Sequence, residues 1–109
     1  MVVTDYFFIG DEELVTAFQF IGVSGIAVNG ADEAVAAFKD VIEGNNENNS
    51  GCKILLMTED TADALGDLAV EWQLSGLYPL LVEIPGLSGR REDRKTLVDA
   101  IRQAIGIHV

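Results

Sequence analysis

Four short apolar runs constrain the fold of this chain more than any other feature. They occupy residues 6–9, 25–28, 53–57 and 80–84, each carries at most one charge, and each is followed by a segment with helical spacing. Strands that are apolar throughout, instead of alternating, are typical of a sheet covered on both faces. The repeated strand-helix order therefore predicts an α/β domain with an open four-stranded parallel sheet. Right-handed crossovers leave few topologies, and we expect strand order 2-1-3-4, as in flavodoxin-like or receiver-like folds.

The segments between the runs predict helices that bury one face. The first begins at the acidic residues 11–13, ends at Gly22, and should face inward through Leu14, Ala17, Phe18 and Ile21. The second should bury Ala34, Val35, Phe38, Val41 and Ile42. A single third helix, capped by Thr58 and closed at Gly76, should bury Ala62, Leu65, Ala69 and Trp72, with Gly66 weakening it only slightly.

The last part of the chain has a charge of its own. Residues 1–89 hold fifteen acidic residues against two lysines, whereas residues 90–109 hold five basic residues against three acidic ones. Within this tail, Leu97, Ile101, Ala104 and Ile105 fall on one face of a helix that Gly106 can close. We therefore expect a core domain over residues 1–85, and a linker with a C-terminal helix over residues 86–109 that docks on the body or extends from it.

Composition excludes several classes of function. A net charge of −11 opposes binding to nucleic acid, and no apolar run approaches the roughly 20 residues needed to insert into and cross a bilayer. The start lacks the basic and apolar regions of a secretory signal, and the single Cys52 cannot form an internal disulfide. These features favour a cytosolic protein. Weak self-association stays open, because an apolar helix face shed by its own sheet could pair with a copy of itself.

Acidic residues follow the first and third predicted strands, where ligands of such sheets usually bind. The loops carry Asp11–Glu13 and Thr58–Asp60, and carboxylates there could hold a divalent cation. A phosphoryl-accepting receiver also needs an Asp ending the third strand, where this chain has Met57-Thr58. Helix capping explains the acids more simply. We therefore expect no residue of this chain to act in catalysis or to bind a cofactor or a metal. The alternative function is a receiver-like signalling domain, or a small cation-binding protein that uses Asp11 and Glu59.

Three stretches, which follow one another in the same order as in the family, resemble the F subunit of the V-type and archaeal-type rotary ATPases. They are Ile9-Gly10-Asp11 followed by Phe18 and Ile21-Gly22-Val23; Ile54-Leu55-Leu56-Met57-Thr58-Glu59; and Leu81-Val82-Glu83-Ile84-Pro85 with the ending Ile101-Arg102-Gln103-Ala104-Ile105-Gly106. The last of these is the most specific. The first helix departs from the family pattern, with Ala17-Phe18 and Ile21-Gly22 where Gly-Phe and Ala-Gly pairs are common.

The resemblance implies a central-stalk protein without an active site of its own. Such a protein binds the coiled-coil D subunit of the rotor axle, belongs to an ion-translocating ATPase or ATP synthase, and influences hydrolysis through its C-terminal helix. It would be cytoplasmic, and peripheral to the membrane through the complex. The resemblance further implies that Arg90, Arg91, Arg94, Leu97, Ile101 and Ile105 bind the partner.

Overall fold

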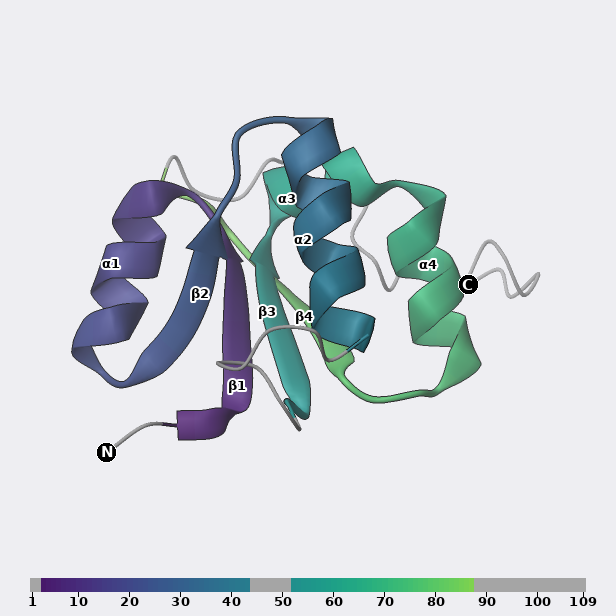
Figure 1. The fold of residues 1–109 in the computed structure, drawn as a ribbon. Coiled ribbons are helices and arrows are strands. Elements are labelled where there is room, and N and C mark those ends of the chain that lie inside the picture. Colours follow the sequence, from purple (N-terminus) through teal and green to yellow (C-terminus); the bar gives the residue numbers. More distant parts are fainter. Residues whose placement is uncertain (1–2, 44–51, 88–109) are drawn as a thin grey trace, which may run out of the picture.

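The fold is an open parallel sheet with helices on both faces, as predicted (Figure 1). The computed structural model describes residues 3–43 and 52–87, so the predicted loop at 44–51 and the C-terminal helix lie outside the described residues. The strand order β2-β1-β3-β4 confirms the predicted order. The elements are β1 (Val3–Gly10), α1 (Glu12–Phe20), β2 (Val23–Ala27), α2 (Ala31–Glu43), β3 (Ile54–Thr58), α3 (Glu59–Leu65), α4 (Asp67–Ser75) and β4 (Leu80–Ile84).

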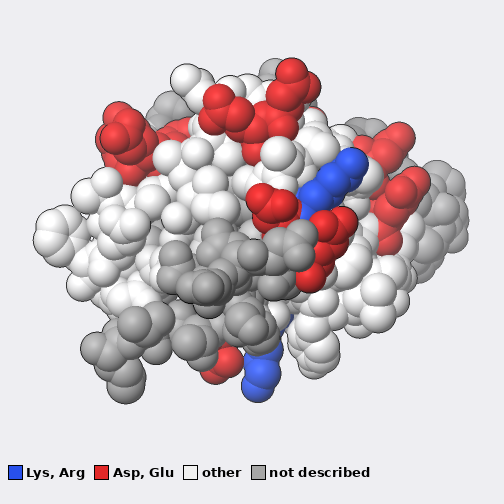
Figure 2. Space-filling model, in the orientation of Figure 1, with Lys and Arg blue, Asp and Glu red and all other residues white. Residues whose placement is uncertain are grey.

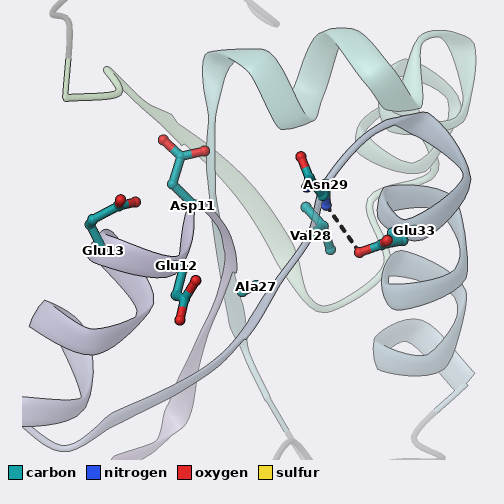
Figure 3. A pocket seen from close by; sticks show the side chains of 7 residues that line it. All are labelled: Asp11, Glu12, Glu13, Ala27, Val28, Asn29 and Glu33. Carbon is teal, nitrogen blue, oxygen red and sulfur yellow. Dashed lines mark hydrogen bonds between the residues drawn. The ribbon is translucent and has the colours of Figure 1, made fainter.

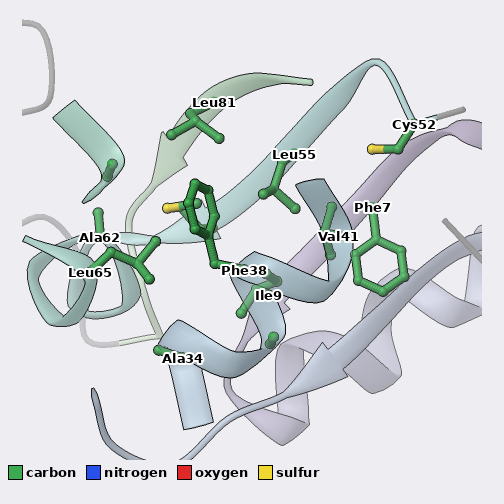
Figure 4. Close-up of a cluster of buried hydrophobic side chains, with 13 residues drawn as sticks. Phe7, Ile9, Ala34, Phe38, Val41, Cys52, Leu55, Ala62, Leu65 and Leu81 are labelled. Atoms are coloured by element: carbon green, nitrogen blue, oxygen red, sulfur yellow. The ribbon is translucent and has the colours of Figure 1, made fainter. Parts of the chain in front are cut away.

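The main core lies between the sheet and helices α2, α3 and α4 (Figure 4). Alternate strand residues supply one side of it, namely Phe7, Ile9, Leu55, Met57 and Leu81. The helices supply the other side through Ala34, Ala37, Phe38, Val41, Ala62, Leu65 and Ala69. The inward faces predicted for the second and third helices are thus confirmed, with Val35, Ile42 and Trp72 partly buried at the margin.

A smaller core lies on the opposite face of the sheet, beneath α1. It is built from Phe8, Val15 and Val23, and the rings of Phe8 and Phe18 lie 4.7 Å apart. The inward face predicted for α1 is only partly right. The helix ends at Phe20, so Ile21 leaves the helical face and is 69% exposed, while Val15 is the buried residue and Ala17 is exposed.

The predicted third helix is two helices that meet at Gly66. This residue has φ 56° and ψ −127°, a combination that only glycine adopts readily, and its backbone N–H still bonds to the Ala62 carbonyl. The break redirects the chain, and Trp72 on α4 then donates a 2.8 Å hydrogen bond to the Pro79 carbonyl and packs edge-on against Phe38. Within residues 3–43 and 52–87, no helix has the length and apolar character that crossing a membrane requires.

Candidate functional site

The carboxyl ends of β1 and β2 open into a polar pocket at the start of α1 (Figure 3). It measures about 340 Å³ and is lined by Asp11, Glu12, Glu13, Ala27, Val28, Asn29 and Glu33. The backbone N–H of Asn29 donates a 3.1 Å hydrogen bond to the Glu33 carboxylate, which fixes the turn before α2. A second hollow of about 250 Å³ adjoins it and is lined partly by Asp60 and Thr61. Asp11 borders both hollows.

The carboxylates of this pocket do not converge. Figure 3 shows the side chains of Asp11, Glu12 and Glu13 pointing in three different directions from the start of α1. No cluster of three or more potential ligands that could hold a metal ion occurs among the described residues. Glu59, which the cation-binding alternative pairs with Asp11, is 3% exposed and lines neither hollow. Asp11 stands at the N-cap of α1 without a side-chain hydrogen bond to the helix, so these acids act on α1 through its dipole, and their divergence does not favour a cation site.

Thr58 occupies the position where a phosphoryl-accepting receiver would need its Asp. Its hydroxyl accepts a 3.2 Å hydrogen bond from the backbone N–H of Thr61 and lies 2.9 Å from the Thr61 hydroxyl. Both side chains are buried. The residue is therefore the predicted cap of α3, and its hydroxyl is engaged in that role.

Cys52 lies two residues before β3 as a small buried side chain, as the sequence predicts. Its thiol is 3.2 Å from the Ile54 carbonyl, to which it donates. Burial raises the pKa of the thiol, because the thiolate would lose its hydration there. A raised pKa reduces the nucleophilic fraction, so the environment does not favour a catalytic cysteine.

The described surface is strongly acidic. Figure 2 shows Asp and Glu side chains along the upper edge of the view and on its right-hand side, with Lys and Arg at only a few points. The upper edge contains the starts of α1 and α2, whose first turns hold Glu12, Glu13, Asp32 and Glu33. A body of this kind attracts basic partners and repels nucleic acid.

The sheet exposes apolar side chains on one half of the face that α1 covers. We call this half the β3–β4 face; it consists of Tyr6, Ile54, Leu56, Leu80, Val82 and Ile84. Alternation places them opposite the main core, and the register sets Tyr6 beside Ile54 and Ile54 beside Leu80. Leu80 is 42% and Val82 41% exposed, whereas Ile84 packs beside the small core under α1.

Sequence reasoning missed this face, although the sequence contained the signal. On the side away from the main core, β3 and β4 carry the apolar residues Ile54, Leu56, Leu80, Val82 and Ile84 at alternate positions, which calls for a cover on this face as well. Among the described helices, only α1 lies on this face, and it packs against β1 and β2. The partner-binding residues predicted from the resemblance, Arg90 to Ile105, lie outside the described residues.

Comparison with known proteins agrees with the resemblance. A model of the ATP synthase (F/14-kDa) subunit family matches residues 7–105. The chain is 31% identical over 103 residues to the F subunit of the A-type ATP synthase of Methanothermobacter thermautotrophicus, covering 93% of this chain and 92% of that protein. The corresponding protein of Methanocaldococcus jannaschii is 30% identical over 100 residues, covering 91% of this chain and 92% of the relative.

A third relative, the A-type ATP synthase F subunit of Methanosphaera stadtmanae, is 26% identical over 107 residues and covers 96% of this chain and 95% of the relative. The three matches span the body and the tail of the chain, as the family match does. The α/β fold and the sheet order fit the same assignment. The chain therefore belongs to the ATP synthase (F/14-kDa) subunit family.

Proposed function

We propose that this chain is a central-stalk component of an ion-translocating A/V-type ATP synthase or ATPase. In this role it has no active site of its own, binds the coiled-coil D subunit of the axle, and modulates ATP hydrolysis through its C-terminal helix. It acts on the cytoplasmic side, attached to the membrane through the complex. The observation that carries the proposal is the family match over residues 7–105, which includes both the body and the tail.

The chemistry of the described residues supports a binding role. The pocket at the carboxyl edge holds divergent carboxylates, Thr58 is engaged as a cap, and the pKa of the Cys52 thiol is raised by burial. These groups lack the convergent geometry that a nucleophile and its base require. The tail, with its basic start and apolar stripe, has instead the pattern of a helix that binds a partner in a groove.

A purification experiment tests the proposal. The full chain is tagged in its native host, membranes are washed at low salt, and the proteins recovered with the tag are identified. We expect the axle protein and the catalytic subunits in the recovered material. The Leu97→Asp/Ile101→Asp variant should lose the axle protein, because two charges enter the apolar stripe of the tail.

The matched control is Thr96→Asp/Gln103→Asp, which adds the same charge on the opposite side of the predicted helix. It should retain the axle protein. Recovery of the tagged chain without any ATPase component, together with unchanged membrane ATPase activity after deletion, would contradict the stalk role. Equal losses in both double variants would contradict the placement of the contact on the apolar stripe.

A further inference from the structure

The two edge strands of the sheet differ in how their outer backbone groups are protected. At the β4 edge, the Gln73 side chain accepts a 3.1 Å hydrogen bond from the Leu81 N–H, and the Trp72 indole donates to the Pro79 carbonyl. Glu83 adds a charge to that strand. Such features discourage pairing with another chain. The sequence of β2, VSGIA, contains neither a charge nor a proline, so the β2 edge lacks these protections.

Alternation identifies the outer backbone groups of β2. The Val28 N–H donates a 3.0 Å hydrogen bond to the Gly10 carbonyl of β1, so the backbone of Val28 faces β1. The register sets Gly25 beside Phe8 and Ala27 beside Gly10, which continues the alternation without interruption. The N–H and C=O groups of Gly25 and Ala27 therefore point away from β1, to the side on which no described strand lies. Gly25 is partly exposed and Ala27 is exposed.

Each end of this edge offers a different kind of contact. At the carboxyl end, Ala27 lines the pocket of about 340 Å³ together with four acidic residues (Figure 3): Asp11, Glu12, Glu13 and Glu33. At the amino end, the last residue of α1 and the residue after it, Phe20 and Ile21, are 86% and 69% exposed. The five residues of β2 separate the two ends by roughly 13–17 Å. An extended segment with a basic and an apolar side chain about five residues apart would reach both.

Charge selects the occupant of the edge. A second copy of this chain would bring the same net charge of −11 and, through its own β2, no basic residue. A segment with arginine or lysine is instead attracted to the acidic pocket. The divergence of the pocket carboxylates suits a guanidinium group, whose five N–H donors also diverge. Antiparallel addition is the more stable mode of pairing, and it sets the basic residue toward the amino end of the segment.

We propose that the free edge of β2 binds an extended basic segment of another protein, which pairs antiparallel with β2 as an added strand. A basic side chain of the segment enters the acidic pocket, and an apolar side chain about five residues later contacts Phe20 and Ile21. The backbone pairing supplies affinity, and the two end contacts select the sequence. The edge is separate from the tail, so this inference does not depend on the proposed contact with the axle.

An NMR titration of the full chain with a synthetic peptide tests the site. The peptide consists of one arginine, two threonine-valine pairs and one leucine, in that order. Its addition should shift the amide signals of Gly25 and Ala27 and slow their hydrogen exchange, because these N–H groups gain acceptors. A peptide with glutamate in place of arginine should bind at least about tenfold more weakly. N-methylation of one alternate set of peptide nitrogens should abolish binding, whereas methylation of the other set should not.

Two double variants of the protein test the contribution of the pocket. Asp11→Asn/Glu12→Gln removes two charges beside the edge and should weaken binding of the arginine peptide at least about fivefold. The matched control, Asp67→Asn/Glu71→Gln, removes two exposed charges from α4, which packs on the opposite face of the sheet. It should bind as the wild type does. Equal losses in both variants would overturn the assignment to this pocket, because general attraction to an acidic body would then explain binding.

The edge itself is tested by Ala27→Pro, which removes an outward N–H and leaves the bonds to β1 in place. This variant should weaken binding as strongly as peptide methylation does. If it does not fold, the two methylated peptides provide the same test from the side of the ligand. Equal effects of the two methylation patterns would overturn the pairing. A dimer of the chain that protects Gly25 and Ala27 without peptide would overturn the choice of occupant. Because no axle is present, these outcomes are independent of the co-purification result.

Discussion

Gly25 shows, at the scale of a single residue, how closely β2 approaches β1. A Cβ placed on Gly25 would lie 2.7 Å from the backbone oxygen of Phe8, its partner in the register. A backbone atom in a paired strand cannot move away without disturbing the ladder. We expect Gly25→Ala to lower the free energy of unfolding by about 1–3 kcal/mol, measured by urea denaturation.

The control for Gly25 is Gly86→Ala. A Cβ at Gly86 meets no atom within 4 Å, so this variant should stay within about 0.5 kcal/mol of the wild type. Unfolding of the two variants at the same urea concentration would contradict the prediction that the close approach of β2 to β1 requires a glycine at position 25.

Cys52 gives a second prediction at this scale, which concerns pH. Burial raises the pKa of its thiol in the folded state, so the folded chain holds the proton more tightly than the unfolded chain does. The stability from this group is fully present below the ordinary thiol pKa and is lost as the pH rises through the folded value. Relative to Cys52→Ala, the wild type should therefore lose stability in alkaline urea titrations. A pH-independent difference between the two proteins would contradict it.

Reaction with a thiol reagent gives an independent measurement. Lys53→Cys in a Cys52→Ala background places the thiol one residue further on, at an exposed position. At the same pH and under native conditions, it should react at least about tenfold faster than Cys52. Equal rates would show that Cys52 is accessible in the folded chain.

Among the elements, α3 depends on a buried cap. The Thr58 hydroxyl accepts the hydrogen bond from the Thr61 N–H, and both residues are buried. Thr58→Val keeps the shape of the side chain but leaves that N–H without its partner. We expect a loss of about 1–2 kcal/mol in the free energy of unfolding. Thr16→Val is the control, because the Thr16 hydroxyl bonds to the Glu12 carbonyl on the exposed face of α1, and it should cost much less.

The elements also show what the sequence could predict. The number, order and pairing of the strands followed from four apolar runs, because sheet burial on both faces leaves a strong pattern. The break at Gly66 was missed. In a sequence, a glycine within a helical pattern indicates only a small loss of helix propensity. The positive φ of 56° at Gly66 becomes apparent only in the structure, where α4 places Trp72 against the Pro79 carbonyl.

The candidate site was predicted less well than the fold. The acidic pocket lies where the topology places it, but the directions of the Asp11, Glu12 and Glu13 side chains depend on local rotamers that a linear pattern does not encode. The β3–β4 face was implied by uninterrupted apolar strands. It could not be located from them, because the apolar pattern does not reveal that α1 packs mainly over β1 and β2.

For the whole molecule, the division of charge connects the fold with the proposed role. The body is acidic and the tail basic, so charge favours contact between the two, while the proposed function assigns the apolar stripe of the tail to a partner helix. A segment with two binding surfaces of similar chemistry distributes between them according to their relative affinities. A lock that holds the tail on the β3–β4 face should therefore remove its action on the partner.

The disulfide pair Val82→Cys/Ile101→Cys provides this lock. The proposed function includes an effect on ATP hydrolysis. In a complex reconstituted with the oxidised chain, this proposed effect should be absent, and dithiothreitol should restore it because reduction frees the tail. The Lys39→Cys/Ile101→Cys chain, treated with the same oxidant, should keep the full effect in both states. If the locked chain modulated hydrolysis as well as the reduced one, release of the tail would have no part in the regulation. The body would then carry the effect, and the exposed pair Phe20 and Ile21 at the end of α1 would be the first place to look for its contact.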